Sequence, residues 1–172
     1  MHMLIRTILI FLKKPFLKPS QFGDKTKISM RVLPNDLDLM FHVNNGIYFS
    51  YMDFGRWDSI FRLGIFDKIR KAGWYFVVAS ETMKFKKSLK LWDKFELETH
   101  IKGFDERYFF IHQKFFLKGE LVATGLVKVR FVKHSGGTVP TSEVLSLLEF
   151  RQYEDVKELA QDLYVLESKY LA

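Results

Sequence analysis

The 172-residue chain contains no cysteine and only four prolines, and its apolar runs are short. The absence of cysteine excludes disulfides, thiolate nucleophiles and cysteine-bound metals, and it fits a reducing compartment. The five histidines do not show the spacing of metal ligands, so we expect no metal site. Any chemistry carried by this chain must therefore use oxygen or imidazole groups.

The charge balance is basic, with a formal net charge of +7 at pH 7. Such a balance favours anionic partners, which include phosphorylated small molecules, acidic membrane surfaces and nucleic acids. We expect no nucleic-acid partner, because there is no RNP-like, zinc or helix-turn-helix signature and the aromatic residues alternate as core residues do. Length and apolar content predict one globular domain over residues 21–140, between an N-terminal segment (1–20) and a helical C-terminal extension (141–172).

The N-terminal segment is apolar over residues 4–12 and carries three lysines within residues 13–18. It is much shorter than the roughly 20 residues that span a bilayer, and Arg6 interrupts it. It also lacks the small-residue cleavage site of a signal peptide. Two interpretations remain: an amphipathic helix docked on the domain or on a partner subunit, which we favour, or peripheral membrane contact through residues 4–18. We expect a cytoplasmic protein, with a position at the membrane periphery as the alternative.

One buried helix dominates the pattern of the domain. Residues 27–33 alternate as a strand, and from Asn45 to about residue 63 the spacing becomes helical, with apolar side chains nearly all round. Gly64 then occupies the position of a left-handed C-cap. A mixed connection over residues 67–73 leads away from this helix.

Four β-type segments follow, at residues 74–86, 95–103, 107–117 and 121–132. One helix followed by an antiparallel meander predicts an α+β fold in which the sheet wraps around a central helix. After Pro140, helical spacing predicts one helix over residues 143–150 and a second from Asp155 onward.

Polar side chains gather in the loop directly before the central helix: Asp36, Asp38, His42 and Asn44. The N–H groups of Asn45 and Gly46 would begin that helix and are suited to polarising a carbonyl group. The same residues are also ordinary turn formers with an N-cap, which requires no catalysis. His42 fits either a role on a carbonyl or a structural one, and Asn44 is expected to cap the helix.

This loop resembles that of the hotdog-fold thioesterases of the 4-hydroxybenzoyl-CoA thioesterase type. The matching residues are Asp38, His42, Val43, Asn44, Asn45 and Tyr48, then Asp53 and Arg56 on the helix. Residues 31–39 and 40–46 are most similar to the thioesterase superfamily member 6-like acyl-CoA thioesterases. Residues 78–88 and 105–109 are also similar to that branch, so the resemblance covers most of residues 27–140.

The resemblance implies a hotdog fold and hydrolysis of a fatty or aromatic acyl-CoA, with coenzyme A as part of the substrate and no separate cofactor. It also implies a homodimer or homotetramer with its sites at the subunit interface. Asp38 matches the catalytic carboxylate, acting as nucleophile or general base, whereas Asp36 matches a position without a fixed catalytic role. Phe41 stands where many relatives have glycine, which either closes a backbone approach or marks a subfamily pocket.

Further residues are candidates for supporting roles. Asp53 and Arg56 lie at i and i+3 of the helix and favour an ion pair, with Asp53 as a secondary catalytic candidate. Lys84, Lys86 and Lys87 form a basic group that would meet the phosphates of coenzyme A or simply be a solvated face.

Two alternatives to hydrolysis remain. A non-catalytic acyl-CoA or lipid-binding hotdog protein would keep the fold and the basic group without needing Asp38. A hotdog hydratase is less well supported, because that class typically has its Asp and His five residues apart, whereas Asp38 and His42 are four apart.

Overall fold

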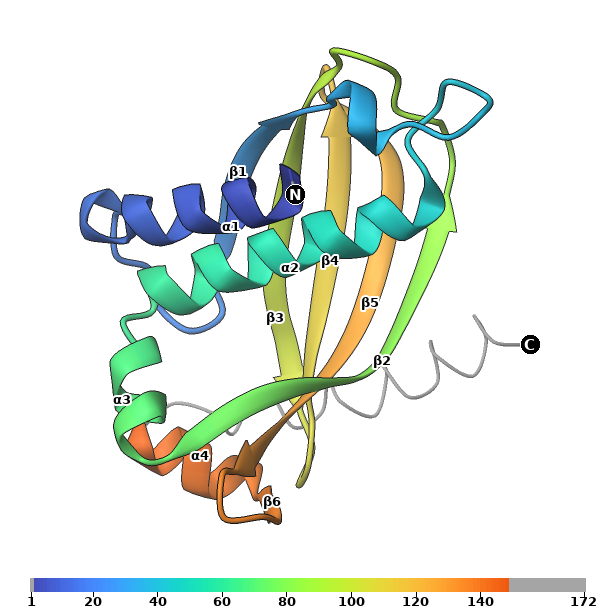
Figure 1. Cartoon of the computed structure of the whole chain (residues 1–172). Coiled ribbons are helices and arrows are strands. Elements are labelled where there is room, and N and C mark those ends of the chain that lie inside the picture. The colour runs from blue at the N-terminus through green and yellow to red at the C-terminus, as the bar shows by residue number, and fades with distance from the viewer. Residues whose placement is uncertain (1, 149–172) are drawn as a thin grey trace.

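The computed structural model describes residues 2–148, which form one curved antiparallel sheet with the long helices on its inner side and the short helices at one end (Figure 1). The helices are α1 (His2–Lys13), α2 (Asn45–Arg62), α3 (Phe66–Lys71) and α4 (Thr141–Leu147), with short 3₁₀ turns at Lys14–Phe16 and Pro34–Asp36. The strands are β1 (Lys25–Arg31), β2 (Trp74–Phe85), β3 (Lys94–Phe104), β4 (Phe109–Leu117), β5 (Glu120–Lys133) and β6 (Thr138–Val139). Within residues 2–148 no helix combines the length and apolar character needed to cross a bilayer.

The strand order is β1-β3-β4-β5-β2, with β6 paired to β5, and every pairing is antiparallel. The prediction that all four β segments form one meander was therefore wrong for the first segment, β2. The strands β3, β4 and β5 do form a meander, but β2 pairs with β5 at the opposite side of the sheet. Residues 86–93 carry the chain from β2 across to β3, and this crossing lets the sheet curl around α2.

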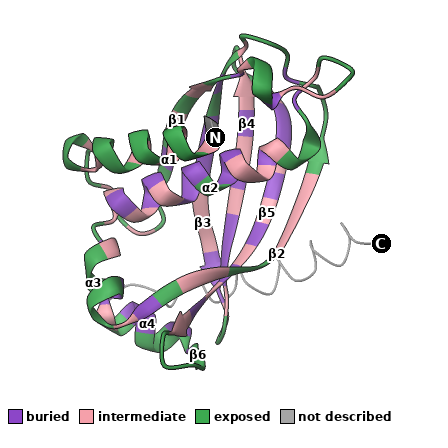
Figure 2. Cartoon of the chain, viewed as in Figure 1, coloured by how far each residue is buried: buried purple, intermediate pink, exposed green. Residues whose placement is uncertain are grey.

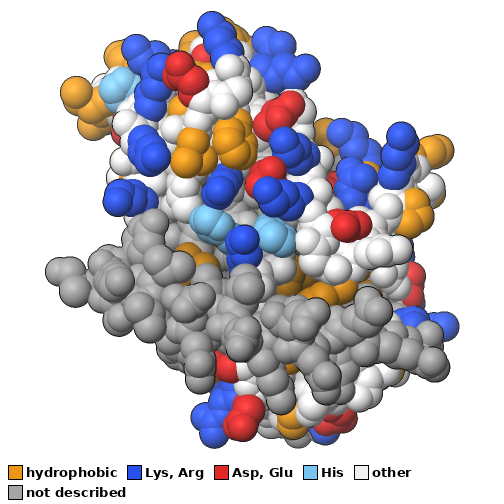
Figure 3. All heavy atoms as spheres, turned by 180° about the vertical axis from the view of Figure 1, so that it is seen from behind, with side chains coloured by type: hydrophobic (Ala, Val, Ile, Leu, Met, Phe, Trp, Pro, Cys, Tyr) orange, Lys and Arg blue, Asp and Glu red, His pale blue; other side chains and the backbone are white. Residues whose placement is uncertain are grey.

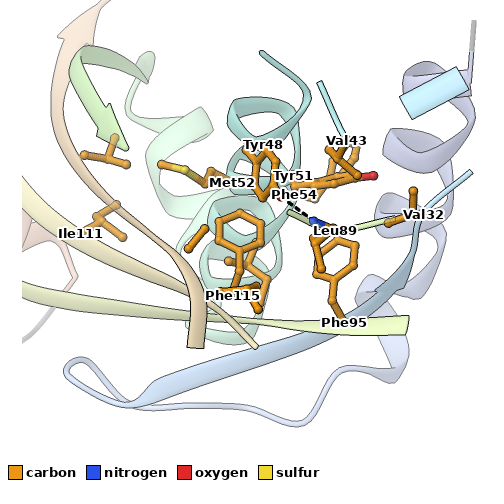
Figure 4. Close-up of a cluster of buried hydrophobic side chains, with 14 of the residues drawn as sticks. Val32, Val43, Tyr48, Tyr51, Met52, Phe54, Leu89, Phe95, Ile111 and Phe115 are labelled. Carbon is orange, nitrogen blue, oxygen red and sulfur yellow. Dashed lines mark hydrogen bonds between the residues drawn. The ribbon is translucent and has the colours of Figure 1, made fainter. Parts of the chain in front are cut away.

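The central helix α2 is buried, as its all-round apolar pattern predicts. Tyr48, Tyr51 and Met52 project from α2 onto Phe95 and Phe115 of the sheet, and all five side chains are almost completely buried (Figures 2 and 4). Burying aromatic side chains of this size contributes roughly 2–3 kcal/mol each. This packing fixes the start of α2 relative to the sheet.

The helix ends as expected, because Gly64 has a φ of +66° in the left-handed region. The connection that follows contains a short helix, α3, which the sequence pattern did not reveal. Helix α4 runs from Thr141 to Leu147, so it begins two residues before the predicted 143–150 helix. Residues 149–150 of that prediction, and the whole helix predicted from residue 155, lie outside the described residues. The predicted docking of the N-terminal helix is confirmed, since α1 lies along α2 (Figure 1).

The outer face of the sheet is charged. Seen from behind, lysine and arginine side chains spread over it with histidines among them (Figure 3). His100 of β3 and His112 of β4 are cross-strand partners in this layer. Lys25 and Lys27 of β1 pair with Glu98 of β3 at 3.6 Å each.

Candidate active site at the start of the central helix

The loop before α2 is a small hairpin fixed to its surroundings by main-chain hydrogen bonds. Leu37 and Val43 form an isolated antiparallel bridge, and the Asp38 N–H donates to the His42 carbonyl at 2.8 Å. The Val43 N–H donates to the Leu89 carbonyl at 3.0 Å, which joins the hairpin to the connection between β2 and β3. The hairpin is therefore held from both sides before α2 begins.

The half-buried Asp38 carboxylate lies within this hairpin. Its Oδ1 accepts hydrogen bonds from the Met40 N–H at 2.8 Å and the His42 N–H at 3.2 Å. Because Oδ1 accepts both bonds, they orient the carboxylate and do not use Oδ2. A carboxylate fixed in this way is suited to attack a carbonyl carbon or to accept a proton from water.

Asn44 caps α2, as the sequence predicts. Its Oδ1 accepts a hydrogen bond from the Gly46 N–H at 2.8 Å, so that donor is already in use. The N–H of Asn45, by contrast, has no acceptor within residues 2–148. Because the N-terminus of α2 also carries the positive end of the helix dipole, Asn45 provides the donor best placed for a carbonyl oxygen.

His42 lies beside these groups with its imidazole half-buried. Its backbone forms an isolated bridge with Lys90, and its ring makes no hydrogen bond to the part of the chain that the structure describes. The backbone of His42 is thus held in the hairpin, whereas its ring is not held by a hydrogen bond from residues 2–148.

Asp36 has a structural position. Its side chain is completely buried, and Oδ2 accepts from Arg6 of α1 at 2.8 Å and from the Leu33 N–H at 2.7 Å. The Asp36 carbonyl also accepts from the Asn44 N–H at 2.9 Å. A buried carboxylate needs such partners, so Asp36 joins α1 to the start of the hairpin.

Phe41 adopts a φ of +58°, in the left-handed region that glycine reaches without strain. Its side chain is 76% exposed and therefore does not fill the space beside the hairpin. The backbone conformation that a glycine would allow is thus kept by a phenylalanine that points outward.

The predicted ion pair between Asp53 and Arg56 is present, and two further groups complete it. The buried Arg56 guanidinium contacts Glu81 of β2 at 2.6 Å and donates to Gln113 of β4 at 3.0 Å. Gln113 in turn donates to the Met52 carbonyl at 2.9 Å. Burial raises the pKa of Glu81, and the charge of Arg56 opposes that rise.

Sequence reasoning missed Glu81 and Gln113. A signal for Gln113 does exist, because it occupies the inward-facing register of β4 between Ile111 and Phe115, where an amide is unusual. No comparable local signal marks Glu81.

A cavity of about 610 Å³ opens beside α2, between α1, α3 and β2. Six of its fifteen lining residues are phenylalanine, tyrosine or tryptophan, including Phe54 and Trp57 of α2 and Tyr75 of β2, and Asp53 contributes a carboxylate. Asp38, His42 and Asn44 do not line this cavity. Within one chain, the hairpin and the cavity are therefore separate features.

The basic group lies next to the hairpin. Lys84, Lys86 and Lys87 are all exposed at the end of β2 and just beyond it. Lys87 contacts Glu120 at 3.1 Å, and a solvent-exposed ion pair of this kind contributes little to stability. Because Leu89 bonds to the hairpin, the fold brings this basic segment and the Asp38 loop to the same end of the molecule.

Among residues 2–148, no group of three side chains is arranged to hold a metal ion.

Comparison with known proteins agrees with this architecture. The chain is 35% identical over 117 residues to Protein THEM6 of Xenopus laevis and 31% identical over 135 residues to Protein THEM6 of Danio rerio. These matches cover 67% and 77% of this chain but only 55% and 64% of the two relatives, so the chain spans little more than half of their length.

Solved structures show the same fold. The DHNA-CoA thioesterase of Staphylococcus aureus superimposes with a TM-score of 0.64 at 20% identity, covering 84% of this chain and 94% of that one. The α+β arrangement is accordingly the hotdog fold. Residues 32–152 match the model of the thioesterase-like superfamily, and the chain belongs to that family.

Proposed function

We propose that this chain hydrolyses the thioester of a fatty or aromatic acyl-CoA, releasing the free acid and coenzyme A. The observation that carries the proposal is the Asp38 carboxylate, oriented by two N–H groups in a fixed hairpin that leads directly into the N-terminus of α2. Family membership and the likeness to the DHNA-CoA thioesterase support thioester hydrolysis in general.

The chemistry follows from these groups. As general base, Asp38 would accept a proton from water while the water oxygen forms a bond to the thioester carbon. The resulting oxyanion would accept a hydrogen bond from the Asn45 N–H at the positive end of α2. Cleavage of the C–S bond then expels the thiolate of coenzyme A, which takes up the proton. As nucleophile, Asp38 would instead attack the thioester carbon and expel the thiolate of coenzyme A, forming a mixed anhydride that water hydrolyses to the free acid and the Asp38 carboxylate.

The remaining candidates support this reaction. His42 would contact the carbonyl or assist proton transfer, and Asn44 would hold the start of α2 through its bond to Gly46. The exposed Lys84, Lys86 and Lys87 would meet the phosphates of coenzyme A at the same end of the molecule.

We infer that a homodimer or homotetramer completes the site. Strand β2 lies at the edge of the sheet, and its outer edge has no strand partner within residues 2–148. The aromatic cavity opens against this strand, whereas the Asp38 hairpin lies elsewhere on the same chain. Pairing of β2 with a second copy would allow the hairpin of one subunit to meet the cavity of the other, with Asp53 at its edge.

The cysteine-free composition fits the cytoplasmic location that we propose with this activity.

The first test is thiol release from short, medium, long and aromatic acyl-CoAs, followed with Ellman's reagent. Because the chain has no cysteine, the reagent reports only coenzyme A. We expect Asp38→Asn to lower kcat by about 100- to 10,000-fold with little change in KM, since the amide keeps the shape but cannot act as base or nucleophile.

Asp105→Asn is the matched control. Asp105 also ties a tight loop, accepting from the N–H groups of Arg107 and Tyr108, but it lies in the β3–β4 turn. If both variants lose activity equally, the role of Asp38 is loop stability. If wild type turns over no substrate yet binds acyl-CoA, the chain is the non-catalytic binding protein that is the alternative.

A further inference from the structure

Helix α1 has apolar side chains on two opposite faces. One face carries Met3 and Ile10, which pack against the core of the domain. The other carries Leu4, Ile5, Ile8, Leu9 and Leu12, which are between 49% and 65% exposed. Their spacing of i, i+1, i+4, i+5 and i+8 places them on one side of the helix. We call these five residues the outward face of α1.

The orientation of α1 is fixed by contacts along its length. Arg6 bonds to the buried Asp36 at 2.8 Å, and Phe11 packs edge-on against Phe61 of α2 at a ring distance of 4.9 Å. Just past the helix, Lys14 contacts Asp67 of α3 at 2.7 Å. The outward face therefore cannot turn inward without breaking these contacts, and it is presented as a rigid apolar strip.

The segment that carries this strip is charged with one sign. Residues 1–23 contain four basic side chains and no aspartate or glutamate. Arg6 and Lys14 are engaged by Asp36 and Asp67, whereas Lys13 and Lys18 are exposed. The strip thus combines an apolar surface with cationic flanks, the combination that binds an anionic lipid surface.

We propose that the outward face of α1 lies in the headgroup region of an anionic membrane, with Lys13 and Lys18 on lipid phosphates and carboxylates. The occupant is a lipid surface and not a second copy of this chain, because a symmetric contact through this face would bring the lysines of the two copies together. The 12 residues of α1 are docked lengthwise on the domain, so the helix lies along the surface. This proposal does not depend on thioesterase activity.

The test is flotation of the full chain with vesicles of phosphatidylserine and phosphatidylcholine, compared with vesicles of phosphatidylcholine alone. We expect Ile8→Gln/Leu9→Gln to weaken binding by at least about 30-fold. Each of the two apolar side chains is half-exposed, and burying its exposed half in the membrane would contribute roughly 1 kcal/mol that glutamine does not provide. Lys13→Gln/Lys18→Gln should weaken binding to the anionic vesicles by about 30-fold, roughly fivefold per lysine. Lys90→Gln/Lys118→Gln, with two exposed lysines outside residues 1–23, is the matched control and should bind as wild type does.

The absence of cysteine allows a second measurement that does not depend on weakening the protein. Leu9→Cys, labelled with the fluorophore NBD, should shift its emission to the blue on anionic vesicles, while the label at Lys118→Cys should not. Equal emission changes at both positions, or no flotation of wild type, would overturn the proposal. So would a dimer that light scattering detects in wild type and that Ile8→Gln/Leu9→Gln abolishes without any vesicle binding, because the face would then join two copies.

Discussion

Gly55, at the centre of α2, gives the sharpest test of the packing that holds the site together. A Cβ atom at this position would lie 2.5 Å from Thr99 Oγ1, 2.8 Å from Gln113 Nε2 and 2.9 Å from Leu97 Cδ2. These three side chains are at most 2% exposed, so none can move into solvent. Alanine at position 55 would therefore displace the amide that accepts the hydrogen bond from Arg56.

The net effect of Gly55→Ala is a balance of two terms. In a helix interior, alanine is more favourable than glycine by about 1 kcal/mol. Overpacking a well-filled core costs about 1–3 kcal/mol, and displacing Gln113 weakens buried hydrogen bonds worth about 1 kcal/mol each. We therefore expect a loss of about 2 kcal/mol in the free energy of unfolding, or roughly 4–8 °C in Tm for a chain of this size.

Urea denaturation of Gly55→Ala, Thr99→Ala and the double variant measures this effect. Because Thr99→Ala removes the nearest contact atom, the double variant should be less destabilised than the sum of the two single changes. Ser50→Ala, at a half-buried position of the same helix, is the control for an alanine introduced without these contacts. A stabilised Gly55→Ala, or strict additivity in the double variant, would refute the close approach of α2 to β3 and β4.

Three other perturbations follow from the described contacts. Arg6→Gln should lower the free energy of unfolding by about 3 kcal/mol in chemical denaturation, because it leaves the Asp36 carboxylate buried without its cation. Phe41→Gly should raise the unfolding free energy by up to about 1 kcal/mol, since it relieves a left-handed φ at an exposed position; a loss would show that the side chain packs. Burial, with a smaller effect of Lys114, lowers the pKa of His112 to about 4 from an ordinary 6.5. Between these values only the unfolded chain takes up the proton, so stability should fall as pH drops from 6.5 to 4. The two pKa values correspond to about 3 kcal/mol, which solvent screening at this half-buried ring reduces to about 2 kcal/mol, and His112→Gln should flatten the slope.

Features that depend on neighbouring residues could be predicted from the sequence. The all-round apolar spacing after Asn45 predicts a buried helix, and Gly64 predicts its left-handed end, because helix burial and capping follow from residues within one or two turns. The cap on α2 was likewise predictable, since Asn44 lies only two residues before Gly46, whose N–H donates a hydrogen bond to it. The Asp38 loop was recognisable because its chemistry is contiguous in the chain.

The tertiary structure decided the contacts between distant residues, for which periodicity carries no signal. The pairing of β2 with β5 depends on how a connection crosses the sheet, and local alternation is the same for either edge. Arg56 meets Gln113, 57 positions away, because α2 crosses β4 at Gly55, and no local pattern encodes that crossing. The separation of the Asp38 hairpin from the aromatic cavity was also invisible in the sequence, since each is built from elements whose distance apart is set only when the sheet curls around α2.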